Sequence, residues 1–519
     1  MKTFLLGIAL AISTASLVGQ EISNDSILSL IRKHGIEKSK VAEIASWITD
    51  VYGPRLTGSP MLDKATEWAT TTMRSWGMSN VHLEEWGPFG RGWELEHFEM
   101  HATSSGGYWP VLAYPKAWSP SVSGEGEVIY LDANTEEELK SYEGKLAGKF
   151  VLLDTIRPLV ERFDPLATRH EAESLLELAN QGLPTPRPRR DFTRRQGGFN
   201  FNSAMWILLQ KEKPLAVLDR GYKGDYGTVF VQGARVEGGS VRDDTTQIIP
   251  QVTLSVEHYN RIFRLLNKGV MTTLSLDMRA RYTNEDDMEH NIIAEIPGSD
   301  LGEKVVMFGA HFDSWHSGTG ATDNGVGSAV MMEVARILLE TIRESGVQPR
   351  RTLRLALWTG EEQGIYGSKN YVGAHYAELP PDSYTPQSLK PANSELSAYY
   401  NLDNGTGKIR GVYMQGNDQL VHLFREWLEP FADDGASTIS LGNTGGTDHL
   451  PFAGIGIPAF QFIQEPMAYG SRTHHSNMDC WDHLVEDDMK QAAMIIASFV
   501  WNTAQLDEKL PRKEEVMER

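Results

Sequence analysis

The 519-residue sequence contains a single cysteine, Cys480, so no disulfide can form within the chain. The fold must therefore be stabilised by its apolar core and by any metal that it binds. Cys480 directly follows Asp479, a candidate site residue, so its thiolate could be a metal ligand. A small buried thiol is the interpretation that we favour.

Long apolar runs and basic runs are also missing. Beyond the N-terminus, no segment approaches the roughly 18 uninterrupted apolar residues that cross a bilayer, so we expect no membrane span. The formal net charge is −20. A nucleic-acid partner is not expected, because phosphate binding requires a basic face. One basic, proline-rich segment, residues 184–195, is interpreted as a solvated surface loop and not as a patch for an acidic partner.

The first residues follow the pattern of a secretory signal peptide. Lys2 precedes a short apolar run, residues 4–12, and small residues continue to Gly19. Such a run is too short for a stable anchor. We therefore expect residues 1–19 to be removed and the protein to be secreted or periplasmic.

The remaining chain is long enough for two domains, and its character changes along its length. Apolar residues recur at helical spacing over residues 26–49 and 62–76, with turn-forming residues between them. From about 107 to 270, short β-like runs alternate with Gly, Pro and charge clusters. From 291 onward, strands alternate with helices, which indicates an α/β fold with a three-layer, mainly parallel sheet. The strands expected there cover residues 292–296, 305–310, 352–358, 398–402 and 458–462, with a helix over 328–339.

Residues of the kinds that bind metal follow these strands. His311 and Asp313 lie two apart after residues 305–310, so their side chains leave on the same face. One can bind a metal while the other orients it, although a structural histidine is the stronger interpretation of this pair alone. Asp323 precedes a tight turn and could bridge two cations or cap the next helix.

Further donors follow the later strands. Glu361 and Glu362 come after residues 352–358, where one carboxylate could bind metal and the other address a water, unless they are a solvated acidic pair. Asp403 ends another strand. His475 could complete the set, with His474 as its rival. Together, His311, Asp323, Glu362, Asp403 and His475 suit two Zn²⁺ ions about 3.5–4 Å apart.

These motifs, in this order, resemble peptidase family M28, the zinc peptidases with two metals in one site. The matching pieces are residues 311–313, 322–325, 360–368, 401–403, 446–452 and 475–479, and residues 53–60 resemble the family's N-terminal lead-in. Residues 313–315, with the short glycine-containing path to Asp323, are most similar to the carboxypeptidase Q branch. The resemblance implies a phosphorylase/hydrolase-like peptidase domain with an inserted, β-rich, protease-associated-like domain.

The resemblance also implies a role for each site residue. Five ligands follow from it: His311 and Asp403 for one zinc ion, Glu362 and His475 for the other, and Asp323 between the two. Glu361 would be the general base, and Asp313 would orient His311. Asp479 matches an aspartate of a family motif whose two threonines are replaced here by Ser476 and Cys480.

The implied organisation is a signal peptide over 1–19, the first part of the peptidase domain over 20–106, the insertion over 107–270, the catalytic part over 271–505 and a charged tail over 506–519. The implied activity is hydrolysis of a peptide or dipeptide near its free N-terminus, as an aminopeptidase or a dipeptidase. Two alternatives remain: a single-zinc glutaminyl cyclase and a non-catalytic binding protein with this fold. The insertion could form a lid or a contact in a homodimer.

Overall fold

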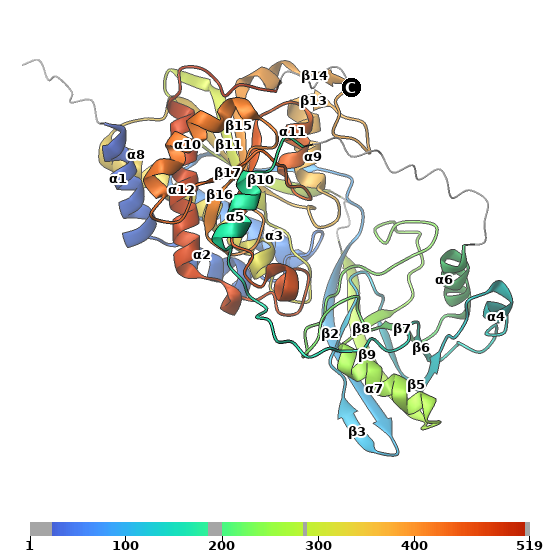
Figure 1. Ribbon diagram of the computed structural model, residues 1–519. Coiled ribbons are helices and arrows are strands. Elements are labelled where there is room, and N and C mark those ends of the chain that lie inside the picture. The colour runs from blue at the N-terminus through green and yellow to red at the C-terminus, as the bar shows by residue number, and fades with distance from the viewer. Residues whose placement is uncertain (1–22, 185–199, 284–287, 514–519) are drawn as a thin grey trace, which may run out of the picture.

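A computed structural model describes residues 23–184, 200–283 and 288–513. Figure 1 shows a large main lobe and a smaller second lobe, which the described residues between 92 and 283 form. The expected signal peptide and nearly all of the basic segment 184–195 lie outside the described residues. Within the described ranges, no helix is both long and apolar enough to cross a membrane.

The main lobe is built on an eight-stranded mixed sheet with the order β1-β10-β12-β11-β15-β18-β16-β17. Its strands are β1 (Ser79–Trp86), β10 (Glu289–Ile296), β11 (Leu301–His311), β12 (Arg351–Trp358), β15 (Leu396–Asn401), β16 (Ile409–Tyr413), β17 (Thr438–Ser440) and β18 (Ala459–Gln464). The central strands β12, β11, β15 and β18 are parallel, whereas β10 and β16 run antiparallel to them. All five expected strands are present, and the four parallel ones, β12, β11, β15 and β18, have their C-terminal ends at one edge.

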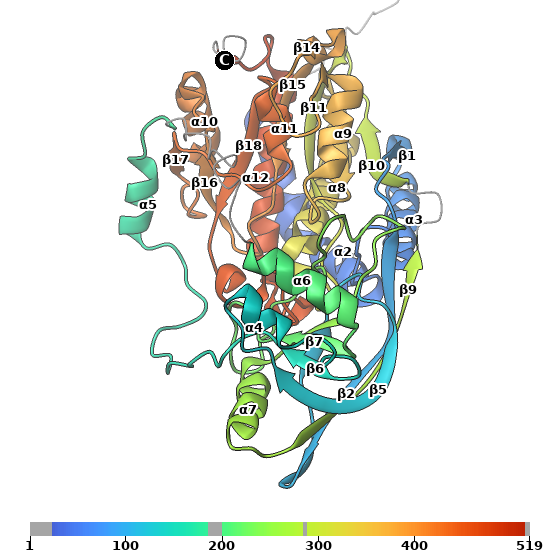
Figure 2. The ribbon, with the colours of Figure 1, turned by 90° about the vertical axis from the view of Figure 1, so that its right-hand side faces the viewer.

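Helices cover both faces of this sheet, which confirms the three-layer α/β prediction (Figures 1 and 2). Successive strand residues point to opposite faces, so Ile292 joins one core and Ile293 the other. The first core contains α1 (Asn24–Arg32), α2 (Val41–Ser46), α3 (Pro60–Trp76), α8 (Val326–Ser345), α10 (Val421–Leu428) and α12 (Glu486–Gln505). The second contains α9 (Tyr366–His375) and α11 (His449–Gly454).

Local signals set the ends of α3. The Ser59 side chain accepts a hydrogen bond from the Leu62 N–H, and Pro60 occupies the first turn, where a missing N–H costs nothing. The helix ends at Gly77, whose φ of 89° lies in the left-handed region that favours glycine. The helical pattern over residues 26–49 is divided between α1 and α2.

The second lobe has its own eight-stranded sheet, with the order β3-β2-β9-β5-β6-β7-β8-β4. Its strands are β2 (Gly92–Ser104), β3 (Gly107–Pro110), β4 (Ala113–Pro115), β5 (Val122–Tyr130), β6 (Phe150–Leu152), β7 (Ala216–Asp219), β8 (Gln251–Leu254) and β9 (Thr272–Thr283). Helix α7 (Val256–Asn267) packs in one of its apolar clusters, and α4 (Glu136–Lys140) and α6 (Phe201–Glu212) pack in the other. This sheet extends beyond the expected interval 107–270, because β2 and β9 pair along their whole length.

The two lobes share an apolar cluster. Trp86 and Trp315 of the main lobe pack there with Trp93 and Trp118 of the second lobe. A segment of the second lobe also reaches back: Thr168 pairs with Met467, and α5 (Ala172–Ala179) lies beside β17. In Figure 2, α5 stands apart from the other second-lobe helices, next to β16 and β17.

Two smaller features complete the main lobe. Strands β13 (Ala377–Glu378) and β14 (Ser388–Leu389) form a short antiparallel pair. After α12, part of the expected charged tail packs on the lobe, since Leu510 is buried and the Asn417 amide donates to the Pro511 carbonyl.

Candidate metal centre

The predicted site residues meet at the edge where the parallel strands of the main sheet end. Strands β12, β11 and β15 are neighbours, so their C-terminal ends lie side by side. His311 is the last residue of β11, Glu361 and Glu362 follow β12, Asp403 follows β15, and Asp323 and His475 come from nearby loops. Residues far apart in the sequence therefore share one small volume.

One group of donors surrounds His311. Its Nε2 lies 3.3 Å from Oδ1 of Asp323 and 3.4 Å from Oδ1 of Asp403. Oε2 of Glu361 lies 3.9 Å from the same nitrogen. The other ring nitrogen, Nδ1, lies 3.0 Å from the main-chain oxygen of Asp313. Because that oxygen can only accept a hydrogen bond, it keeps the proton on Nδ1, and Nε2 is left free to face the carboxylates.

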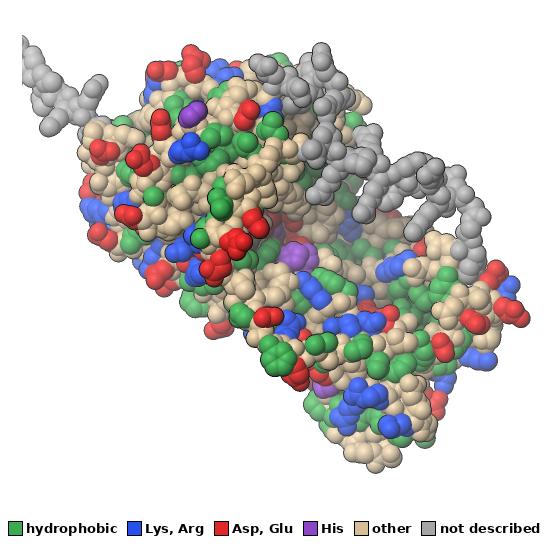
Figure 3. Space-filling model, in the orientation of Figure 1, with side chains coloured by type: hydrophobic (Ala, Val, Ile, Leu, Met, Phe, Trp, Pro, Cys, Tyr) green, Lys and Arg blue, Asp and Glu red, His purple; other side chains and the backbone are tan. Residues whose placement is uncertain are grey.

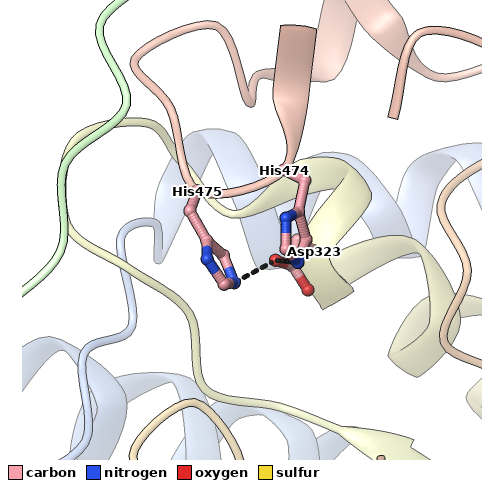
Figure 4. Close-up of side chains that lie close together, drawn as sticks. All are labelled: Asp323, His474 and His475. Atoms are coloured by element: carbon pink, nitrogen blue, oxygen red, sulfur yellow. Dashed lines mark ion pairs between the residues drawn. The ribbon is translucent and has the colours of Figure 1, made fainter. Parts of the chain in front are cut away.

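A second group surrounds His475. Its Nε2 lies 2.9 Å from Oε2 of Glu362 and 3.0 Å from Oδ2 of Asp323. Figure 4 shows the Asp323 carboxylate facing the histidine rings. Asp323 thus presents one oxygen to His311 and the other to His475, as a bridging carboxylate would.

The donor atoms of this edge fit a metal. Among the described residues, Asp323 belongs to both of two groups that could each hold an ion: one with His311 and Asp403, the other with His474 and His475. Of the predicted ligands, four have a buried atom that makes no hydrogen bond within the described residues: Nε2 of His311, Oδ2 of Asp323, Oε1 of Glu362 and Oδ1 of Asp403. Buried polar atoms are rarely unpaired unless an ion or a water satisfies them. Imidazole and carboxylate are ligands that Zn²⁺ accepts.

Charge at the edge also favours a cation. Burial raises the pKa of Glu361 well above its usual range and that of Glu362 to about 7, and nearby carboxylates add to both shifts. Burial opposes protonation of His475, but Glu362 and Asp323 raise its pKa to about 11. The buried carboxylates therefore have too little positive charge near them. A bound dication would supply it.

Asp313 holds the loop that carries the two glutamates. Its carboxylate accepts hydrogen bonds from the main-chain N–H groups of Glu361 and Glu362, each at 3.2 Å, and from the Thr57 hydroxyl at 2.9 Å. Its Oδ1 is 3.6 Å from Nδ1 of His311, farther than its main-chain oxygen. Its side chain therefore contacts the glutamate loop more closely than it contacts the His311 ring.

Asp479 holds the turn that carries Asp323. Its carboxylate accepts from the N–H and the hydroxyl of Thr322, at 2.6 and 2.8 Å, and from the Asp323 N–H at 3.2 Å. The alternative that Asp323 caps α8 is wrong, because the N-cap position belongs to Gly325, and the side chain that bonds to the first turn is that of Asn324, whose Oδ1 accepts from the Gly327 N–H at 3.1 Å. The Asp323 carboxylate is left to face the histidines.

Sequence reasoning missed two site residues. Asp448 precedes α11 and is fully buried; its Oδ1 accepts from the Ser368 hydroxyl at 2.5 Å, and burial raises its pKa to about 7. Burial raises the pKa of Tyr469 well above the usual range, and the nearby carboxylate of Asp323 adds to the shift. Asp448 lies in a quoted motif, but no local pattern indicated its contact with the site.

His474 and Cys480, the alternative metal ligands considered from the sequence, lie farther from the site or outside it. Nε2 of His474 lies 3.7 Å from Oδ2 of Asp323, farther than His475, and its ring stacks on the His475 ring. Cys480 is only partly buried, so the preferred interpretation as a buried thiol is wrong. Its Sγ contacts Nδ1 of His483 at 3.5 Å, and it belongs to neither ligand group found among the described residues.

Arg55 holds the loop between β11 and α8 in place through hydrogen bonds of its side chain. It is fully buried, and its guanidinium donates to four main-chain oxygens, those of Ile48, Phe312, Thr319 and Gly320. Burial lowers its pKa to about 10, while Asp479 and Asp313 oppose that shift. The lead-in segment 53–60 thus contributes a cation beneath the acidic edge.

Replacing Arg55 with leucine should lower the free energy of unfolding by about 3 kcal/mol or more, since each buried carbonyl left without a donor costs about 1–3 kcal/mol. Urea unfolding in excess chelator measures this without a contribution from metal. Arg279→Leu is the control, because Arg279 is exposed on β9. Equal stability of the two variants would show that these hydrogen bonds are unimportant.

Comparison with known proteins agrees with this geometry. The sequence model of peptidase family M28 matches residues 291–500. Carboxypeptidase Q of Mus musculus is 25% identical over 489 residues, covering 92% of this chain and 88% of the mouse protein. Carboxypeptidase Q of Homo sapiens is 26% identical over 480 residues with the same coverage.

A solved structure of a peptidase M28 precursor from Shewanella amazonensis has a TM-score of 0.65 at 21% identity, covering 95% of this chain and all of that one. A zinc aminopeptidase from Bacillus subtilis has a TM-score of 0.55 at 18% identity, covering 92% and 96%. These likenesses confirm the fold class. The resemblance to family M28 and to its carboxypeptidase Q branch is also confirmed.

Proposed function

From the peptidase family M28 domain that this chain carries over residues 291–500, we propose that it is a zinc-dependent exopeptidase acting near the free N-terminus of a peptide or dipeptide. One observation carries the proposal: Asp323 presents one oxygen to each of two histidines, and each histidine also faces a second carboxylate. This arrangement supports the proposal of two metal ions in one site.

We assign His311 and Asp403 to one zinc ion, Glu362 and His475 to the other, and Asp323 to both. When bound, the two ions would supply Lewis acidity to the scissile carbonyl and lower the pKa of a water toward neutrality. Glu361 takes a proton from the attacking water and passes it to the leaving amine. The Asp313 carboxylate accepts a hydrogen bond from the main-chain N–H of Glu361 and so keeps Glu361 in place.

The excess of carboxylates supports a substrate with a free amino group. Two dications would balance four negative charges, whereas the site gathers seven carboxylates: Asp313, Asp323, Glu361, Glu362, Asp403, Asp448 and Asp479. The remaining negative charge favours an α-ammonium group over a carboxylate near the reacting bond. An N-terminal residue is therefore the better fit.

The space beside the site suits a small peptide. A cavity of about 550 Å³, walled largely by the second lobe, borders the site at His475, the one proposed ligand among its lining residues. Figure 3 shows the molecule hollowed between its two lobes. Ligand pockets of about 300–1,000 Å³ hold molecules of dipeptide size.

The protease-associated-like insertion, the 107–270 division and export through residues 1–19 remain predictions from the sequence.

Zinc titration of the chelator-treated protein tests the proposal. We expect about two equivalents to bind at saturation and activity to return with them. The full chain should then hydrolyse free dipeptides, whereas N-acetylated analogues of the same dipeptides should resist. A single equivalent with cyclisation of N-terminal glutamine would establish a glutaminyl cyclase instead. Zinc binding without turnover of either kind of substrate would indicate a non-catalytic binding protein.

A further inference from the structure

A short segment of the second lobe runs beside the loop that carries His475. Phe230 pairs with Ser476, and the Val231 N–H donates to the His475 carbonyl at 3.1 Å. Asn477 adds two side-chain bonds: its Oδ1 accepts from the Val229 N–H at 2.7 Å, and its Nδ2 donates to the Gly227 carbonyl at 3.1 Å. The ligand loop of the main lobe is thus held by residues 227–231, outside the match to the family.

The backbone of His475 needs such support. Its φ is 63°, in the left-handed region that a residue with a side chain adopts at a cost. Residues in this conformation persist where surrounding contacts fix them. The pairing with Val231 fixes His475 directly, and in Figure 4 the pale green ribbon of the second lobe passes on the side of His475 away from Asp323.

The second lobe also reaches the imidazole ring itself. The side-chain Nε2 of Gln232 lies 2.9 Å from Nδ1 of His475, while Nε2 of the His475 ring faces Glu362 and Asp323. A histidine that binds metal through Nε2 carries its proton on Nδ1 and needs an acceptor there. The Gln232 amide can be that acceptor, because a half turn about its terminal bond exchanges its nitrogen and its oxygen.

The two histidines differ in the source of this support. Nδ1 of His311 faces the main-chain oxygen of Asp313, within the main lobe, and a substitution cannot remove a main-chain oxygen. Nδ1 of His475 faces a side chain from the other lobe. Only the metal position that His475 serves should therefore depend on the second lobe.

On these grounds we infer that Gln232 is a positioning residue: it orients His475 and sets the zinc affinity of one of the two metal positions. The inference rests on the proposed function, since it takes His475 as a ligand. It makes the second lobe part of the metal centre and not only a wall of the cavity. Gln232 acts through His475 and need not touch the substrate.

Zinc affinity of the full chain, measured by competition with a chromophoric chelator, tests the inference. In Gln232→Leu, we expect one zinc ion to bind as in the wild type and the other about 10- to 100-fold more weakly, the usual effect of losing such a partner. Gln232→Glu, which keeps an acceptor, should bind both ions within a few-fold of the wild type. Gln210→Leu is the control, because the Gln210 amide contacts the Gln247 carbonyl in the same lobe.

The possible results separate the inference from the proposed function. A wild-type protein that binds fewer than two zinc ions contradicts the proposed function. If the wild type binds two, unchanged affinities in Gln232→Leu overturn the inference. Equal weakening of both ions, or no recovery in Gln232→Glu, also overturns it, because the effect would then reflect a general disturbance. Gln232 is exposed, so both variants should fold, and circular dichroism of the metal-free proteins checks this.

Discussion

Replacing Glu361 with glutamine is expected to lower kcat by about 10²- to 10⁴-fold, the usual contribution of a general base, without changing zinc content. Its Oε2 is 3.9 Å from Nε2 of His311, close to the ligands, whereas the contacts that define the two ligand groups do not require it. Glutamine has nearly the same shape but cannot take a proton from water. Steady-state kinetics on a free dipeptide, with metal analysis of the same sample, measures both quantities.

The matched control is Glu378→Gln, because Glu378 is an exposed acid on β13 of the same lobe. It should retain wild-type activity. Near-wild-type turnover by Glu361→Gln with full zinc would contradict the assignment of the base. A loss of zinc in that variant would instead make Glu361 a ligand.

Asp323→Asn should have the largest effect on metal binding. Both oxygens of Asp323 are used, Oδ1 toward His311 and Oδ2 toward His475, so the change weakens both metal positions together. We expect a zinc content well below two per chain and a loss of activity of about 10³-fold or more, as for other groups that act as a unit. Metal analysis after dialysis against a weak chelator measures the first effect.

The fold should survive this change, because Asp479 holds the turn through the main chain of Asp323 and not through its carboxylate. Asp382→Asn, at an exposed acid of the main lobe, is the control. Retention of one tightly bound zinc ion would show that Asp323 serves a single metal and does not bridge.

The main sheet and its donors could be predicted because both depend on local signals. Apolar runs followed by glycine-containing turns located β11, β12 and β15, and the donors follow each strand within a few residues. Parallel strands then bring those donors to one edge, which makes the convergence of Glu362 and Asp403 near His311 a consequence of topology. His475 was found by its residue type and by the family resemblance, not by a strand end.

The remaining site features depend on contacts between distant segments, which no local pattern encodes. Gln232 comes from the other lobe, and Tyr469, whose pKa Asp323 helps to raise, lies on a loop with no metal-binding pattern. The hydrogen bonds from the main-chain N–H groups of Glu361 and Glu362 to the Asp313 carboxylate could be predicted only if the geometry of the loop were known. The sheet of the second lobe reaches beyond residues 107–270 for a similar reason: the long pairing of β2 with β9 joins segments at the two ends of the lobe.

The pairing of β1 with β10 has a consequence for the order of folding. Trp86 of β1 pairs with Glu289 of β10. In the sequence, one partner precedes the whole second lobe and the other follows it. During synthesis from the N-terminus, helices α1 to α3 and β1 emerge long before the sheet that covers them. Non-local pairing is slow, and exposed apolar faces invite aggregation until it forms. The main lobe can therefore close only after the second lobe has been made, which ties the maturation of the peptidase core to its neighbour.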